Sequence, residues 1–99
     1  MSLLDEMKLN LRVTGDWADD EITMLIEGAK ADMVRVGVER PLVEEGDHPL
    51  VKNAIACYCK SRFGFDNPDA RRFEGLYRQC VCDLLNSSAN IAAQDGSYD

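Results

Sequence analysis

Residues 49–63 read PLVKNAIACYCKSRF, and their side chains are apolar around most of a helical circumference. The least apolar part is one narrow stripe, which consists of Lys52, Asn53, Ala56 and Lys60. Pro49 suits the first turn of a helix, because the backbone N–H that proline lacks would have no intrahelical partner there. A helix that is apolar on several sides is buried on several sides. We therefore predict that residues 49–63 form the central helix of the fold.

A long amphipathic helix is predicted before this segment. Asp16 is a suitable N-cap, and the acidic residues 19–21 occupy the first turn, where the helix dipole favours negative charge. Gly37 is expected to end the helix. One apolar stripe runs between these signals and contains Ile22, Leu25, Ile26, Ala29, Met33 and Val36.

A second amphipathic helix is predicted after the central segment. Asn67 and Pro68 suit its N-cap and first residue, and it extends to about Asn86. Its apolar face is expected to hold Phe73, Leu76, Tyr77, Cys80, Val81, Leu84 and Leu85.

The remaining segments complete the predicted architecture. A short helix over about residues 3–13 has Leu4, Met7 and Leu11 at helical spacing, and Gly15 follows its end. Residues 38–48 carry turn chemistry and predict an exposed acidic loop. We predict an all-α fold with a single domain of about four helices over residues 1–86. Residues 87–99, which are small, polar and aperiodic apart from Ile91, are expected to form a flexible tail.

The distribution of charge is uneven along these 99 residues. Residues 1–48 hold five Lys and Arg against twelve Asp and Glu, whereas residues 49–83 hold six against four. The net charge of −7 argues against a free-standing nucleic-acid binder, which usually has a basic surface. An acidic half and a mildly basic half can attract one another between copies of the chain, or both can be solvated helix faces.

The residue types that usually carry chemistry all have structural explanations. Cys57 and Cys59, like Cys80 and Cys82, lie two positions apart, and such side chains point about 200° apart on a helix. A shared metal ion is therefore disfavoured, and the reducing cytoplasm disfavours an interhelical disulfide. We expect buried thiols at Cys57, Cys59 and Cys80, with Cys82 partly exposed. His48 is interpreted as a helix cap. We predict no enzymatic activity, with no catalytic residue, no cofactor and no metal site.

Seven charged residues are candidates for a subunit interface. The basic group could contact DNA phosphates, acidic residues of a neighbouring subunit, or only water. The candidates are Asp19, Asp20, Glu21, Arg62, Arg71, Arg72 and Arg78.

The sequence also bears on location. No apolar run approaches the roughly 20 residues that span a membrane, so we expect no membrane association. The first residues lack the basic region and apolar stretch of a secretory signal, which leads us to expect the cytoplasm.

The order and spacing of three motifs resemble a known family. A long helix with the pattern DDEIxxLIxxAK follows a Gly-Asp turn, then residues 49–55 read PLVKNAI, and residues 63–70 read FGFDNPDA before the last helix. Over about residues 3–86 the chain resembles the small head–tail connectors of tailed bacteriophages and prophages, which are head-completion or adaptor proteins also labelled as DNA-packaging proteins.

This resemblance implies a structural role. A connector subunit would form a homo-oligomeric ring, either alone or only on the portal, between the portal protein and the tail-side proteins. DNA would pass through the ring without sequence-specific binding, and the protein would be found in the host cytoplasm during assembly and then in the virion. The residues alone leave one alternative, which is a generic helical adaptor or regulatory domain that binds a protein partner.

Overall fold

The computed structural model describes residues 2–64 and 67–87, and these residues contain five helices and no strand. The helices are α1 (Leu3–Leu11), α2 (Asp19–Val36), α3 (Arg40–Glu45), α4 (Pro49–Arg62) and α5 (Ala70–Leu85). The all-α prediction is confirmed. Apart from Ser87, the predicted 87–99 tail lies outside the described residues.

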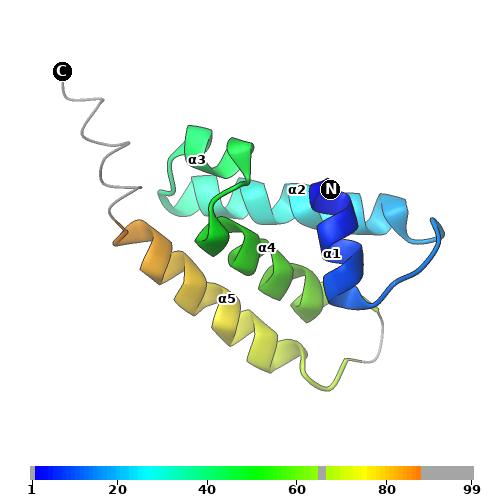
Figure 1. Cartoon of the computed structure of the whole chain (residues 1–99). Coiled ribbons are helices and arrows are strands. Elements are labelled where there is room, and N and C mark those ends of the chain that lie inside the picture. Colours follow the sequence, from blue (N-terminus) through cyan, green and yellow to red (C-terminus); the bar gives the residue numbers. More distant parts are fainter. Residues whose placement is uncertain (1, 65–66, 88–99) are drawn as a thin grey trace.

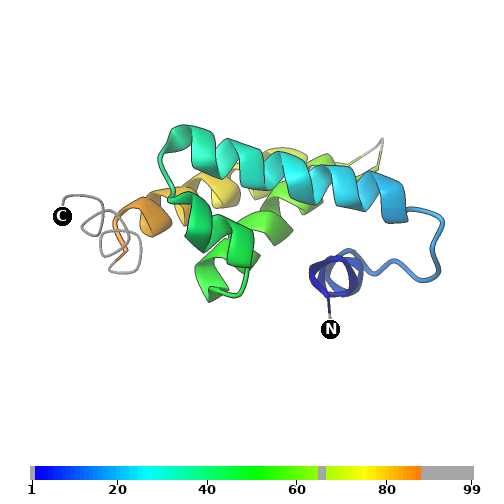
Figure 2. The same cartoon turned by 90° about the horizontal axis from the view of Figure 1, so that it is seen from above.

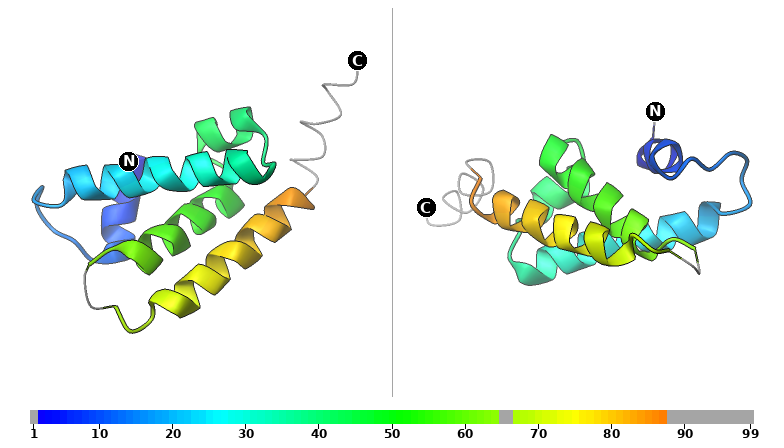
Figure 3. Two further views of the ribbon diagram at one scale, coloured as in Figure 1. Left: turned by 180° about the vertical axis from the view of Figure 1, so that it is seen from behind. Right: turned by 90° about the horizontal axis from the view of Figure 1, so that it is seen from below.

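The central position predicted for residues 49–63 is also confirmed. α4 lies between α2 and α5, and these three helices form one layer (Figure 1). α1 packs on α2 and α4, and α3 packs on α2. Both short helices lie on the same side of the layer, and no other element of residues 2–64 and 67–87 covers its opposite side, which we call the uncovered side (Figure 2, and Figure 3, left).

The core draws on every helix. Five residues of α4 are buried, namely Val51, Ala54, Ile55, Ala56 and Cys59. They pack against buried side chains of the other elements, which are Met7, Ala18, Ile22, Ile26, Ala29, Met33, Val38, Val43, Tyr77, Val81 and Leu84. Since these side chains come from all five helices, burial of apolar surface is what holds the short helices α1 and α3 in place.

One segment differs from the sequence prediction in kind. The sequence predicts an exposed acidic loop over residues 38–48, but residues 40–45 form helix α3. Val38 and Val43 are almost fully buried, and the carbonyl of Leu42 accepts a hydrogen bond from the N–H of Gly46, which has a left-handed φ of 66°. Burial of the two valines stabilises this short helix. The helix is too short to show a periodic pattern in the sequence, which is why the sequence predicts a loop.

The helix boundaries differ from the predicted ones by a few residues. α1 ends at Leu11 because Arg12, not Gly15, adopts the left-handed conformation at its C-cap, which lets both Leu11 and Val13 pack against the core. α2 begins after Ala18 rather than after Asp16; Ala18 is the N-cap, and its side chain is buried in the core. Gly37 ends α2 as predicted, with a φ of 118°.

The last helix also begins later than predicted. α5 starts at Ala70, and Asn67 caps the preceding turn instead, its Oδ1 accepting a hydrogen bond from the N–H of Asp69 at 3.1 Å. Leu76, which the sequence pattern assigns to the apolar face, is 44% exposed. Leu76 therefore lies at the edge of the buried face of α5, and this face is narrower than the sequence pattern indicates.

Candidate subunit interface

The one histidine has a structural role, and no metal-binding cluster is found among the described residues. His48 is the N-cap of α4, and its Nδ1 accepts a hydrogen bond from the N–H of Leu50 at 3.1 Å, as its interpretation as a cap predicts. Within residues 2–64 and 67–87, no three His, Cys, Asp or Glu side chains come close enough together to hold a metal ion. In the same part of the chain, no helix is long and apolar enough to cross a membrane.

The four cysteines are free thiols with different surroundings. Cys59 is buried in the core, and burial raises the pKa of its thiol to about 12. Cys57 and Cys80 are half-buried and contact one another across α4 and α5; burial, followed by the neighbouring Cys57, raises the pKa of Cys80 to about 11. Cys82 is exposed, as predicted. Thiols with raised pKa values are mostly protonated at neutral pH and therefore weak nucleophiles.

The three acidic candidates at the start of α2 are not equivalent. Asp19 faces inward, and its Oδ1 lies 2.8 Å from Nζ of Lys8 on α1. Asp20 and Glu21 are exposed and make no ion pair within the described residues. Two exposed apolar side chains lie at the same end, and neither is among the sequence candidates: Trp17, which precedes α2, is 73% exposed, and Met24 on α2 is 75% exposed. We call Trp17, Asp20, Glu21 and Met24 the acidic end.

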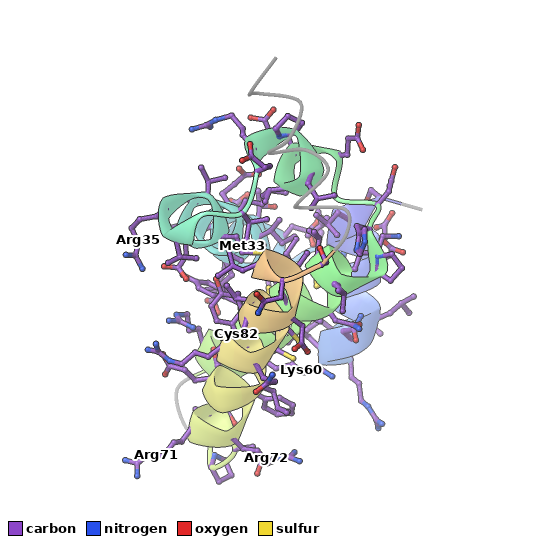
Figure 4. The ribbon with its side chains drawn as sticks, turned by 90° about the vertical axis from the view of Figure 1, so that its left-hand side faces the viewer. Met33, Arg35, Lys60, Arg71, Arg72 and Cys82 are labelled. Carbon is purple, nitrogen blue, oxygen red and sulfur yellow. The ribbon has the colours of Figure 1, made fainter. Side chains whose placement is uncertain are left out.

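The basic candidates separate onto two sides of α5. Arg71 and Arg35 project on the uncovered side of the helical layer, whereas Arg72 projects on the other side (Figure 4). Arg72 lies 3.9 Å from Asp69, and Arg71 makes no ion pair within the described residues. Arg62 and Arg78 both approach Glu74, at 3.7 Å and 3.3 Å. The fold therefore gathers Arg62, Arg78 and Arg35 around one depression and leaves Arg72 apart from them.

That depression is a groove of about 450 Å³ on the uncovered side, between α2 and α5. We call it the basic groove, and it is lined by Asp32, Arg35, Val36, Arg62, Glu74, Tyr77, Arg78, Val81, Cys82 and Leu85. Its rim carries three arginines and two carboxylates, and Val36, Val81 and Leu85 provide apolar surface. Sequence patterns could not locate it, because its residues come from three helices that the tertiary fold brings together.

A hydrogen-bonded cluster holds the middle of the groove in place. The Tyr77 hydroxyl donates to Oδ2 of Asp32 at 2.7 Å, and Arg35 donates to Oδ1 at 2.6 Å. The bond from Tyr77 lowers the pKa of Asp32, with Arg35 adding to the effect and partial burial opposing it. Asp32 is therefore ionised at neutral pH, and the cluster fixes α2 against α5.

The guanidinium of Arg62 fills the space between the helices. It lies 3.9 Å above the ring of Tyr58, which in turn packs edge-on against Tyr77 with ring centroids 5.2 Å apart. Such a stack restrains the long side chain of Arg62 and keeps its charge in the groove. The sequence candidates did not include Tyr58, Tyr77 and Asp32. Aromatic residues on the apolar face of a helix have the same pattern as ordinary core residues, and Asp32 has the pattern of a solvated charge.

Fold and surface together define a small all-α protein whose polar clusters position helices and whose free charges face outward. Comparison with known families identifies the family to which the protein belongs. The family model described as Phage connector protein matches residues 3–90, which is most of the chain, so the protein belongs to the phage connector proteins. Comparison with curated proteins and with solved structures gave no match.

Membership of this family indicates a structural role in the phage particle. Phage connectors are structural proteins of the virion, and they act together with other capsid and tail proteins. The resemblance seen in the order and spacing of the sequence motifs is thereby confirmed at the level of the family.

Proposed function

We propose that this protein is a ring-forming head–tail connector subunit, which joins the portal to the tail-side proteins and leaves a central passage for DNA. The observation that carries the proposal is the match to the phage connector family over residues 3–90. That range includes all five helices, so the whole helical domain, which we take as residues 1–86, belongs to the proposed subunit.

The arrangement of charges supports assembly in a ring. A closed ring of identical subunits needs two different surfaces on each subunit, one of which contacts the other on the next copy. Asp20 and Glu21 lie at one end of α2, and the basic groove lies at the other end. We propose that the interface candidates Asp19, Asp20, Glu21, Arg62, Arg71, Arg72 and Arg78 act at such contacts, Asp19 and Arg62 through the neighbours that they hold in place.

The net charge suits a passage for DNA. A protein binds DNA tightly when it neutralises many phosphates with Lys and Arg. At a net charge of −7, a ring of these subunits repels phosphates and lets DNA slide without sequence-specific binding. In this proposal the protein acts without enzymatic activity and without a cofactor. It assembles in the host cytoplasm and remains at the head–tail junction of the virion.

Removal of the gene from its phage tests this function. Without the protein, filled heads and finished tails should accumulate separately, because nothing joins them, and electron microscopy of the lysate would show both. A plasmid copy of the wild-type gene should restore joined particles. A normal yield of joined, infectious particles in the absence of the protein would contradict the proposal.

A further inference from the structure

Two of the most exposed large apolar side chains among the described residues, Trp17 and Met24, lie at the acidic end. Trp17 is the only tryptophan of the chain, and its indole contacts Phe63 on one side, with ring centroids 6.1 Å apart, while most of its surface remains exposed. Met24 lies further along α2, on the side opposite to the buried Ile22 and Ile26. Large exposed aromatic side chains flanked by charge are typical of interface hot spots.

The basic groove combines exposed apolar surface with positive charge, which complements the apolar and negatively charged acidic end. Its apolar residues include Val36, which is 38% exposed, and Leu85. Its rim carries Arg35 and Arg78, whose side chains are 71% and 76% exposed. Each of these arginines contacts one carboxylate within the chain, and a guanidinium has five N–H donors, so donors remain available for another carboxylate.

The two surfaces cannot meet within one molecule. Both include residues of α2, and Met24 and Val36 are separated by about 18 Å along this one straight element. One copy can therefore present its acidic end to a second copy while its own groove accepts a third. Contacts of this kind are heterologous, and they close into a ring when the rotation between copies permits.

We propose that the acidic end of each copy docks into the basic groove of the next copy. Trp17 and Met24 cover the apolar surface of the groove, and Asp20 and Glu21 pair with Arg35 and Arg78. The charges favour a second copy of this chain as the occupant: three arginines and two carboxylates line the groove, so it keeps an excess of positive charge, and the exposed carboxylates next to Trp17 complement it. This inference rests on the proposed function, since it names the surfaces through which the ring would form.

The single tryptophan gives a direct measurement. Fluorescence emission of the wild-type chain should shift to the blue as its concentration rises, either alone or with the portal protein of the same phage, because docking removes Trp17 from water. The mass of the same samples is followed by light scattering. Assembly without a change in Trp17 emission would overturn this contact and leave the ring intact. Absence of assembly under both conditions would overturn the proposed function as well.

Charge reversal tests which surfaces pair. The variant Asp20→Arg/Glu21→Arg and the variant Arg35→Glu/Arg78→Glu should each weaken self-association at least about tenfold, because like charges then face one another. An equimolar mixture of the two should assemble again, since each altered surface complements its counterpart on the other variant. Failure of the mixture to assemble, with both variants folded by circular dichroism, would overturn the pairing.

Two further variants serve as controls. Glu45→Arg/Asp47→Arg makes the same change in net charge as the acidic-end variant, at exposed positions away from both surfaces, and it should associate like the wild type. Met24→Asp keeps all arginine contacts intact and should still weaken association, because it places a charge against the apolar part of the groove. Unchanged association of Met24→Asp would contradict the docking arrangement even if the arginine variants fold poorly.

Discussion

Tyr58 lies where α2, α4 and α5 come together, and a glycine makes room for it. A Cβ atom at Gly28 would lie 2.9 Å from the Tyr58 hydroxyl oxygen, which is closer than van der Waals contact allows. The ring of Tyr58 has little freedom to move, because Tyr77 packs on one edge and Arg62 stacks on its face. Gly28 thus sets the spacing between α2 and α4 at this point.

Alanine substitution of two helical glycines measures this effect. A Cβ atom at Gly75 in α5 would have no neighbouring atom within 4 Å, so Gly75→Ala should stabilise the protein by about 1 kcal/mol through helix propensity alone. Gly28→Ala should instead destabilise it by about 1 kcal/mol, because overpacking exceeds the gain in propensity. Urea denaturation measures both free energies of unfolding. Equal stabilisation by the two substitutions would show that Tyr58 is free to move.

The bond between Tyr77 and Asp32 links stability to pH. The pKa of Asp32 is lower in the folded protein than its ordinary value of 3.8, chiefly because the Tyr77 hydroxyl donates to the carboxylate. The resulting stabilisation is complete at pH values above the ordinary pKa and is lost as the pH falls through the lowered one.

Replacement of Tyr77 by phenylalanine tests this link. Tyr77→Phe should lower the free energy of unfolding by about 1 kcal/mol at pH 7, because it removes one hydrogen bond to a charged group and leaves the ring in place. The difference from the wild type should shrink at pH values well below 3.8, where Asp32 becomes protonated in both proteins. Urea denaturation at the two pH values provides the measurement. A difference that stays constant with pH would mean that the hydroxyl does not act through Asp32.

At the scale of helices, the sequence predicts the long elements and misses the short one. α2, α4 and α5 each repeat an apolar stripe over several turns, and Gly37 and Pro49 mark ends that the fold keeps. α3 has six residues, which is less than two turns, so no stripe can repeat. Pro41 and Gly46 mark its two ends, but both residue types are equally common in loops. Only the burial of Val43 in the folded protein distinguishes a helix from a loop over residues 40–45.

The contribution of α3 to stability follows from that burial. Val43→Ala should cost about 2 kcal/mol, because the side chain is fully buried and its removal leaves a cavity in the core beneath α3. Glu45→Ala, at an exposed position of the same helix, should change stability by less than about 0.5 kcal/mol. Thermal unfolding of the two variants would give the comparison. A Val43→Ala protein as stable as Glu45→Ala would mean that residues 40–45 behave as an exposed loop.

At the scale of the whole molecule, the sequence predicts only part of the candidate interface. The unequal distribution of charge is visible in the sequence, and it draws attention to the start of α2 and to the arginines of α4 and α5. Their separation onto two sides of α5 depends on how the helices pack, as does the engagement of Asp19 with Lys8. The place of Met24 opposite Ile26 on α2 predicts that its side chain is exposed. A single methionine makes no repeating pattern, however, so the sequence does not mark it as an interface residue.

Membership of the phage connector proteins is consistent with the outward charges and with the helical face that no element of the described residues covers. A connector works through the surfaces that it presents to its neighbours, and in this molecule the two proposed surfaces lie at opposite ends of one helix, α2. The partly buried cluster of Tyr58, Tyr77 and Asp32 keeps α2 and α5 in the relative position that the basic groove requires.

Native mass spectrometry of the protein, alone and with the portal protein of the same phage, tests whether the chain forms a ring. A ring-forming connector should give one discrete complex with a fixed number of copies of this chain, and that number should be the same at every concentration at which the complex forms. A chain that stays monomeric at all concentrations and does not bind the portal protein would contradict its assignment as a ring-forming connector.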